Sequence, residues 1–463
     1  MLSIQPKPGS SKGKLEEVTQ LLADLKSDLD AKKLSVKQRQ QLLEQLKVHG
    51  RSVENADPIF TKDGIHTLCR YAFECGNSET SQEALRCIAN AQLLVPKTRQ
   101  ILVDLGYAPE AADRLKNETI DDEFLAARIL FLMTYETDLD YEKLVAENHL
   151  AESINAALTR HAKRYSRSAR RLSQMHTSPM DLMALSETLK LLFNITHFYP
   201  DISHQFSKSI PHIFKILLRR SIPSPPLQAP VNYLINALIN LDLEDNKGQQ
   251  LEFLGMNAVF PKFDANCNAE KLVNILDSAI VAYTEPELDN IISPVLTLIR
   301  RVYEIAPDNV KKYMESLLLP TDDERTRPLG QSDTLSARLL RLSTSAMTPS
   351  LRGSISAMMF ELSGKDATQF VHNVGYGFAS GFLLSNNIQM PENAMEAHAT
   401  ADPEKAIPVN PITGQRLDME SPDQGEPMTQ EEKEREAERL FVLFERCVIL
   451  LAIVFVWLYL RYY

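Results

Sequence analysis

Four stretches of this 463-residue chain share one pattern, in which a leucine or isoleucine is followed five positions later by asparagine or threonine. They end at Asn90, Thr134, Asn194 and Asn240, so the spacings are 44, 60 and 46 residues. Each stretch reads as part of an amphipathic helix. Two spacings match the roughly 40 to 47 residue period of armadillo and HEAT repeats, and the third equals one period plus an insertion. The pattern predicts an all-α, armadillo/HEAT-like right-handed superhelical solenoid.

Composition supports a helical array. The chain is too long for one typical core, holds only 16 glycines and 7% aromatic residues, and shows no convincing strand pattern. Its formal charge of −11 argues against a nucleic-acid partner, because phosphate contacts need a surplus of lysine and arginine. An acidic solenoid more often binds a basic protein segment.

We divide the chain at changes in composition. Residues 1–14 are predicted to be a disordered N-terminus, and residues 15–384 the helical repeat domain, with a basic loop insertion at 159–180. Residues 385–430 are proline-rich and polar, which predicts a disordered, mobile linker that holds the NPITG motif at 410–414 as an anchor. Residues 431–463 are predicted to form a C-terminal helix that ends in an apolar run.

The apolar run at 447–460 is 14 residues long. As a helix it would span about 21 Å, which is short of a hydrocarbon core near 30 Å. Three interpretations stay open: a tail anchor that contacts the membrane, a helix packed on the solenoid, and an alternative or misread transcript end.

The stretch from Leu317 to Leu384 has clear helix boundaries. Thr334 is a predicted N-cap, Leu351 to Leu362 has helical apolar spacing, and Gly364 is a predicted C-terminal stop. The glycine-rich end at 375–381 has the wrong spacing for a phosphate-binding loop, and no strand precedes it. The glycines in this segment are better explained as small residues that let helices approach closely, or that permit a positive φ angle at a turn.

No residue pattern supports covalent chemistry. The chain lacks a nucleophile elbow, a P-loop and an HExxH motif, so we expect no enzyme and no cofactor. His66 and His197 sit in helical contexts and are expected to be packed or surface residues. The five cysteines are scattered without a CxxC pair, so no metal site is predicted and reduced thiols in a cytoplasmic protein are expected.

The asparagines that end the helical pattern are candidate binding residues. In a solenoid, Asn90, Asn194 and Asn240 can project from inner helices into a concave groove and pair with the backbone of a bound peptide. The alternative is that each caps a helix or satisfies a buried carbonyl.

Several segments also resemble one family. They are DERTRPL, LSARLLRLSTS and QFVHNVGYGFASGFLL within 317–384, then EALRCIAN, ARILFLMT, ETLKLLFNIT, VNYLINALINL and NPITGQRL elsewhere. Together they are similar to the synembryn family, over most of residues 40 to 446. The resemblance implies a guanine-nucleotide exchange factor and folding chaperone for heterotrimeric G-protein α subunits, and we expect it to act as a monomer.

The resemblance also implies contacts. Lys47 and Arg51 are expected to meet the carboxylate at the end of the last helix of the α subunit, with Asn90 as a groove amide. Lys47 stands where arginine is expected, so a bidentate contact becomes a point charge. Arg338 and Arg341 contact the GTPase core or are solvent-exposed helix charges.

Two further expectations concern the regulation of this protein and the function that competes with nucleotide exchange. The family's acidic tail is absent from the end of this sequence, so tail-dependent regulation is expected to be absent too. The competing function is an armadillo-type peptide-binding adaptor without exchange activity.

Overall fold

The computed structural model describes residues 11–76, 78–164, 178–244, 258–389, 409–410 and 412–420, with single residues at 429, 435 and 439. Every regular element in these ranges is helical, and their one β contact is an isolated bridge between Val409 and Arg416. The predicted all-α solenoid is confirmed. Most of the predicted linker at 385–430, and nearly all of the predicted C-terminal helix at 431–463, lie outside the described residues.

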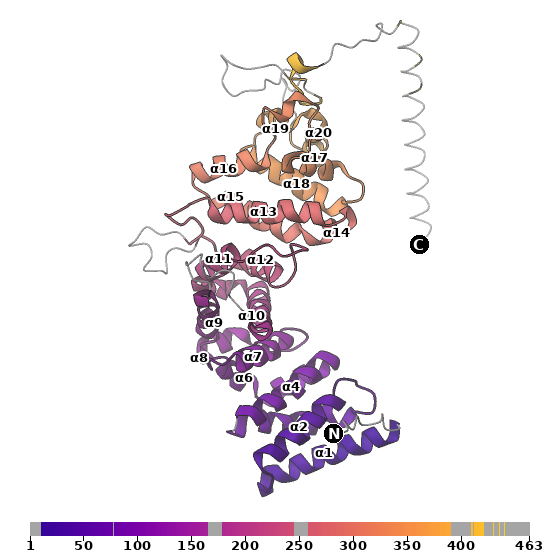
Figure 1. Ribbon diagram of the computed structural model, residues 1–463, viewed down its shortest axis with the longest axis vertical. Helices are drawn as coiled ribbons and strands as arrows, with labels where there is room; N and C mark the ends of the chain where they lie inside the picture. The colour runs from indigo at the N-terminus through magenta and orange to yellow at the C-terminus, as the bar shows by residue number, and fades with distance from the viewer. Residues whose placement is uncertain are drawn as a thin grey trace, which may run out of the picture.

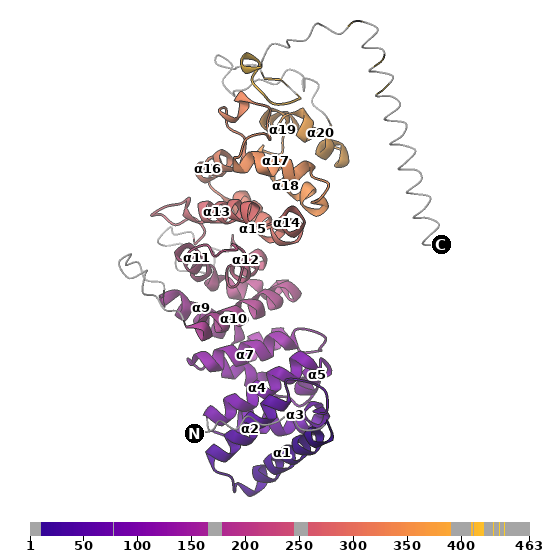
Figure 2. The ribbon, with the colours of Figure 1, turned by 45° about the vertical axis from the view of Figure 1, so that its right-hand side comes forward.

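The helices stack into an elongated molecule (Figures 1 and 2). One layer, which we call the inner layer, contains helices that each pack on the next: α2 (Val36–His49), α4 (Ser78–Leu94), α7 (Ile120–Met133), α10 (Pro179–Phe198), α12 (Val231–Asn240), α15 (Ser293–Ile305) and α18 (Pro349–Leu362). Both ends of the stack reach further right in Figure 1 than its middle, and α10 and α12 lie to the right of α9 and α11. The inner layer therefore lines the concave side.

The outer layer covers the other side of these helices. It consists of α1 (Ser11–Ala31), α3 (Lys62–Cys69), α5 (Lys97–Asp104), α6 (Ala108–Arg114), α8 (Tyr141–Asn148), α9 (Leu150–Arg164), α11 (Ile210–Arg219), α13 (Cys267–Ala282), α16 (Asp308–Leu318) and α17 (Leu335–Thr344). A short helix α14 (Glu285–Ile291) packs on α15 and α18, and α19 (Ala367–Val374) and α20 (Tyr376–Ser385) close the far end. One apolar core runs through the stack from Val18 to Leu383.

The asparagine-ended pattern marks the inner layer. Its four stretches fall on α4, α7, α10 and α12, with the last position at or near the C-terminal end of each helix. Because each helix buries its apolar face only against its neighbours, this periodicity identifies four consecutive members of the stack.

The local signals at the far end of the solenoid are also found in the structure. The Thr334 hydroxyl accepts a hydrogen bond from the backbone N–H of Ala337 and caps α17. Gly364 has φ of 68°, and Gly375, between α19 and α20, has φ of 83°. Glycine adopts such positive φ angles more readily than other residues. This explains why a glycine, Gly375, joins α19 to α20.

Three helix ends differ from the prediction, and one of them is the start of α10 at Pro179, inside the predicted loop 159–180. Helix α1 begins at Ser11, inside the predicted disordered segment 1–14. Helix α9 continues to Arg164, so the first six residues of the predicted loop 159–180 are helical. The reason is that His161 and Ala162 extend the buried face of α9. Residues 165–177 lie outside the described ranges.

Within the described ranges, no helix combines the length and apolar character needed to cross a bilayer. The apolar run at 447–460 is not part of those ranges.

Candidate functional site

The inner layer carries polar contacts that join successive helices near their C-terminal ends. The Asn194 amide, which is 5% exposed, donates to the Thr134 hydroxyl at 2.7 Å. The Asn240 amide donates to the Phe193 carbonyl at 3.3 Å. Both asparagines therefore bond to the preceding inner helix. Asn240 satisfies a carbonyl, as the alternative interpretation from the sequence described, whereas Asn194 bonds to a hydroxyl.

Arginine continues this arrangement where the asparagine pattern ends. Arg301 on α15 donates to the carbonyls of Leu238, Ile239 and Leu241, at the C-terminal end of α12. Helix C-termini leave carbonyls without partners and favour positive charge, so a guanidinium satisfies both needs. This contact was not predicted, because a single arginine carries no periodic signal.

Asn90 differs from the other two asparagines. It is half-buried on α4, and its side chain has no hydrogen bond with the described part of the chain. It shares one stripe of α4 with Glu83 and Arg86, since residues three, four and seven apart lie on the same face of a helix. Asn90 is therefore an available amide on the inner face.

Lys47 belongs to a charge ladder that links three inner helices. Its Nζ lies 2.6 Å from the Glu83 carboxylate on α4. Arg86 lies 2.6 Å from Glu83 and 2.6 Å from Asp121 on α7. The Lys47 side chain is only 18% exposed, so it is held largely by the solenoid itself. A partner carboxylate has to compete with Glu83 for it.

Arg51 lies just beyond α2, after the cap at Gly50. It is exposed, and its guanidinium has no ion pair within the described residues. Of the two basic residues predicted to meet a carboxylate, Arg51 is the one that is free to do so.

The middle of the inner face combines charge with aromatic rings. Glu187 on α10 bonds to Arg128 at 2.9 Å and to Lys190 at 2.7 Å. The Lys190 Nζ lies 4.7 Å from the Phe131 ring centroid and 5.7 Å from that of Tyr233, so the lysine bridges α7, α10 and α12. Such cation–π contacts hold the ammonium against the rings.

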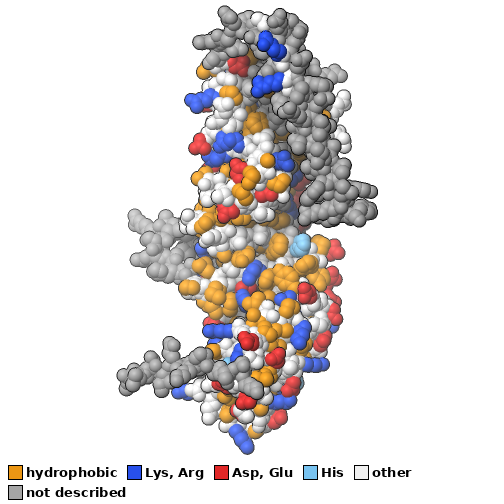
Figure 3. All heavy atoms as spheres, turned by 90° about the vertical axis from the view of Figure 1, so that its right-hand side faces the viewer, with side chains coloured by type: hydrophobic (Ala, Val, Ile, Leu, Met, Phe, Trp, Pro, Cys, Tyr) orange, Lys and Arg blue, Asp and Glu red, His pale blue; other side chains and the backbone are white. Residues whose placement is uncertain are grey.

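Exposed apolar side chains lie at the C-terminal ends of the inner helices. They are Leu93 and Leu94 at the end of α4, Tyr135 after α7, and Phe198 at the end of α10. Figure 3, which views the concave side, shows hydrophobic side chains gathered about the middle of the molecule with charges around them. Contiguous exposed apolar surface of this kind is typical of a protein-binding site.

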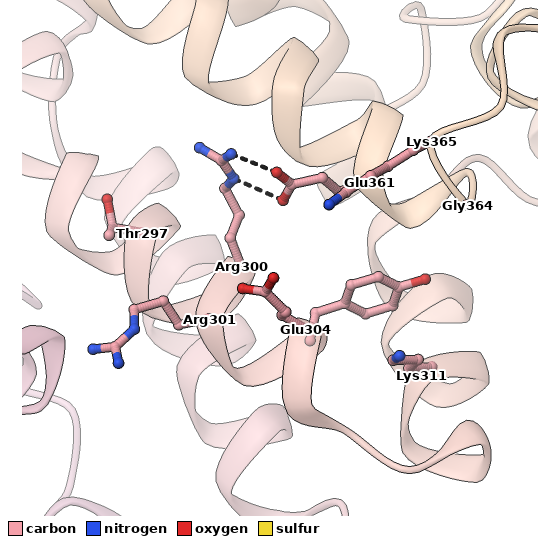
Figure 4. Close-up of a pocket in the computed structure, with 9 residues that line it drawn as sticks. Thr297, Arg300, Arg301, Glu304, Lys311, Glu361, Gly364 and Lys365 are labelled. Carbon is pink, nitrogen blue, oxygen red and sulfur yellow. Dashed lines mark hydrogen bonds and ion pairs between the residues drawn. The ribbon is translucent and has the colours of Figure 1, made fainter. Parts of the chain in front are cut away.

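A hollow of about 510 Å³ opens between α15, α16 and α18. In Figure 4, Arg300 and Glu361 point toward each other and are joined by hydrogen bonds, and Arg301 points away from them. Arg300 bonds both carboxylate oxygens of Glu361, at 2.8 and 2.5 Å. Arg300 is thus bonded to α18, and Arg301 to the C-terminal end of α12. Both arginines of the hollow therefore connect inner-layer helices.

Arg338 and Arg341 hold α17 in place. Arg338 pairs with Asp277 on α13 and with Asp333. Arg341 donates to the carbonyls of Gly330 and Ser332 at 2.6 and 2.8 Å. Both guanidinium groups are engaged with their own chain, and the structure does not bring them near Lys47, Arg51 or Asn90.

A buried carboxylate joins α7, α9 and α10. Glu123, 2% exposed, lies 2.7 Å from His161 Nε2, accepts from the Thr188 hydroxyl at 3.1 Å and lies 3.3 Å from Arg160. Burial acts to raise the pKa of Glu123, but the hydrogen bond and charge of His161 and the charge of Arg160 outweigh it, so the pKa lies below its usual range. Sequence reasoning missed this cluster because Glu123 and His161 are 38 residues apart.

The NPITG segment docks on the far end of the solenoid. The Arg325 guanidinium is buried and donates to the carbonyls of Gly414, His372 and Asn373 at 3.2, 3.0 and 2.9 Å. The backbone N–H of Leu329 donates to Thr413 at 2.9 Å. Residues 409–410 and 412–420 thus pack across α19 and the segment before α17.

The described residues contain no group of three or more side chains suited to a metal ion. The cysteines among them are unpaired, and burial raises the pKa of Cys87 to about 12, so its thiol stays protonated.

Comparison with known proteins identifies the family. The family model described as guanine nucleotide exchange factor synembryn matches residues 42–448. The chain is 24% identical to the chaperone Ric-8A of Rattus norvegicus, with 89% of this chain and 81% of the relative covered. It is 25% identical to Ric-8A of Xenopus laevis, with 87% and 80% covered. A synembryn-like chaperone of Schizosaccharomyces pombe is 26% identical, with 59% and 53% covered. The resemblance seen in the sequence is confirmed, and the chain belongs to the synembryn family of guanine nucleotide exchange factors.

Proposed function

We propose that this chain accelerates GDP release from heterotrimeric G-protein α subunits and assists their folding. The observation that carries the proposal is the family match over residues 42–448, which includes almost the whole solenoid. The relatives from rat and fission yeast are named as chaperones, which supports the folding half of the proposal.

The proposed mechanism needs no covalent step. An exchange factor binds the nucleotide-free state of its partner more tightly than the nucleotide-bound state, and that difference drives release. Displacing a nanomolar nucleotide takes several kcal/mol of differential binding. A long inner face with exposed apolar side chains beside charged groups suits this task, because it offers a large contact area.

We propose that the last helix of the α subunit, which ends in the chain's terminal carboxylate, binds at the N-terminal part of the inner face. Within the described residues neither Arg51 nor Asn90 has a side-chain partner, so Arg51 supplies a guanidinium for that carboxylate and Asn90 an amide on the next inner helix. Lys47 joins them only when the carboxylate competes with Glu83. The nearby Leu93 and Leu94 suit the apolar face of an amphipathic helix.

The other candidate residues take supporting roles in this proposal. Asn194 and Asn240 hold neighbouring inner helices together, since each amide is bonded within the solenoid. Arg338 and Arg341 fix α17 to α13 and to the preceding loop.

The test is release of labelled GDP from a purified α subunit. We expect the wild-type chain to accelerate release, and the double variant Lys47→Glu, Arg51→Glu to lose most of that acceleration. The matched control is Lys33→Glu, Lys37→Glu, two exposed lysines just before and at the start of α2 that form no ion pair with the described part of the chain. This variant carries the same charge change and should behave as wild type.

Other outcomes separate the alternatives. No acceleration, with binding to the isolated C-terminal peptide of the partner retained, would favour a peptide-binding adaptor. Equal loss in both double variants would show that net charge matters and that the named contacts do not.

A further inference from the structure

Two windows of the sequence contain no acidic residue. Residues 153–180 and 202–241 lack Asp and Glu entirely, although 61 of the 463 residues are acidic and the formal charge is −11. An even distribution would place several acids in each window. The described parts of the two windows therefore differ sharply in charge from the rest of the chain.

The fold brings the outer-layer parts of these windows together. Helix α9 packs against α11 and against the 3₁₀ segment Pro200–Ser209 that leads into α11. Lys208, His212, Lys215 and Arg219 are spaced by four, three and four residues, so they lie along one side of this helical segment. Burial and the charges of Lys215 and Lys163 lower the pKa of His212, which places Lys163 of α9 beside the same side.

We call Lys163, Lys208, Lys215 and Arg219 the basic stripe. None of the four has an ion pair or a side-chain hydrogen bond with the described part of the chain. Lys163 and Lys208 are exposed, and Lys215 and Arg219 are partly so. Lys47 on the inner layer, by contrast, is paired with Glu83.

We propose that the basic stripe docks this protein on an anionic lipid bilayer. From Lys208 to Arg219 the stripe is about 16 Å long at 1.5 Å per residue. It presents separate charges mostly on flexible lysine stems and no bidentate cradle. Such an arrangement suits mobile lipid headgroups, whereas a fixed acidic helix is better matched by paired donors in set positions.

The position of the stripe fits this role. Helices α9 and α11 lie on the opposite side of the stack from α10 and α12 (Figure 1). A molecule that lies on a membrane through its basic stripe keeps its concave face open to a protein partner. The inference does not depend on exchange activity.

The expected strength follows from the charges. A basic residue near an anionic membrane contributes about 1 kcal/mol, which is about fivefold in partition coefficient. Salt weakens this attraction, because exposed charges are screened beyond a Debye length of about 8 to 10 Å. Neutralising the four cations should therefore lower the partition coefficient about 100-fold or more.

The experiment is cosedimentation of the full chain with vesicles. One set is phosphatidylcholine alone, and the other is phosphatidylcholine and phosphatidylserine in a two to one ratio, each at low and high salt. The stripe variant replaces four residues with glutamine: Lys163→Gln, Lys208→Gln, Lys215→Gln and Arg219→Gln. The control variant replaces four exposed lysines without ion pairs: Lys33→Gln, Lys37→Gln, Lys62→Gln and Lys97→Gln. Circular dichroism checks that both variants fold.

We expect the wild type and the control variant to bind phosphatidylserine vesicles at low salt and to be released at high salt. The stripe variant should lose this binding and keep GDP-release activity towards a soluble α subunit. Equal binding by both variants, or binding that ignores phosphatidylserine and salt as an apolar tail would give, overturns the proposal. Binding of an oligoglutamate peptide without binding of vesicles also overturns it, in favour of an acidic protein partner.

Discussion

The substitution Glu123→Gln tests whether a buried ion cluster holds the middle of the solenoid together. The carboxylate joins three helices through His161, Arg160 and Thr188, at 2.7, 3.3 and 3.1 Å. Glutamine keeps the shape of the side chain but replaces one acceptor oxygen with a donor and removes the negative charge. Because Oε1 bonds to His161 and Thr188 while Oε2 faces Arg160, the single oxygen of glutamine leaves either His161 or Arg160 without its acceptor, and both lose the negative charge beside them.

The magnitude follows from burial. Glu123 and His161 have side chains only 3 and 4% exposed, and removing one partner from a buried pair costs about 3 to 5 kcal/mol. The matched control is Glu152→Gln on α9, whose carboxylate is 63% exposed and lies 4.0 Å from His149. Exposed pairs of this kind contribute at most about 1 kcal/mol, so the control should change little.

The assay is urea unfolding followed by circular dichroism. Because a solenoid can unfold in parts, the midpoint of the transition is compared rather than one extrapolated free energy. We expect Glu123→Gln to lower the midpoint clearly and Glu152→Gln to leave it nearly unchanged. Equal midpoints for the two variants would refute the view that the cluster stabilises the stack.

The same comparison predicts a pH dependence. The pKa of Glu123 is lower in the folded chain than its ordinary value, so its stabilisation is complete above the unfolded pKa of about 4.3. That stabilisation is lost as pH falls through the folded value. The difference in midpoint between wild type and Glu123→Gln should therefore be constant near neutral pH and shrink below about pH 4.

Three shorter predictions follow. Asn194→Ala should destabilise the solenoid by about 1 kcal/mol in the same urea assay. Asn90→Ala should leave stability unchanged but weaken binding of a peptide that copies the C-terminal helix of the α subunit. Glu83→Gln releases its lysine partner and should tighten binding of that peptide severalfold by fluorescence polarisation; weaker binding would contradict the proposed carboxylate site. Gly414→Ala leaves no room beside Leu329 and disfavours the φ of 69°, so trypsin should cut faster within 409–420 while the urea midpoint is retained.

The sequence predicted the stack because apolar periodicity records which side of each helix is buried. The four asparagine-ended stretches fall on consecutive inner helices, and the Thr334 cap is found as expected. These signals are local, and each depends on residues within one or two turns.

The polar contacts could not be predicted in the same way. Asn90, Asn194 and Asn240 share one pattern, yet among the described residues two of them bond to a neighbouring helix and Asn90 does not. The difference lies in how closely the adjacent helix approaches, which depends on packing between segments 44 to 60 residues apart in the chain. Glu123 and His161 likewise meet only after α7 and α9 have packed.

The inner layer has a mechanical consequence, because its helices pack on one another in a single series from α2 to α18. Such a stack deforms as a set of springs joined in series, in which each spring is the interface between two helices. The interface that deforms most easily therefore dominates the stiffness of the whole stack. A small rotation at each interface adds up to a large change in the distance between the two ends. A partner that grips both ends therefore works against this elasticity, and a substitution at any single interface can alter how far the molecule opens.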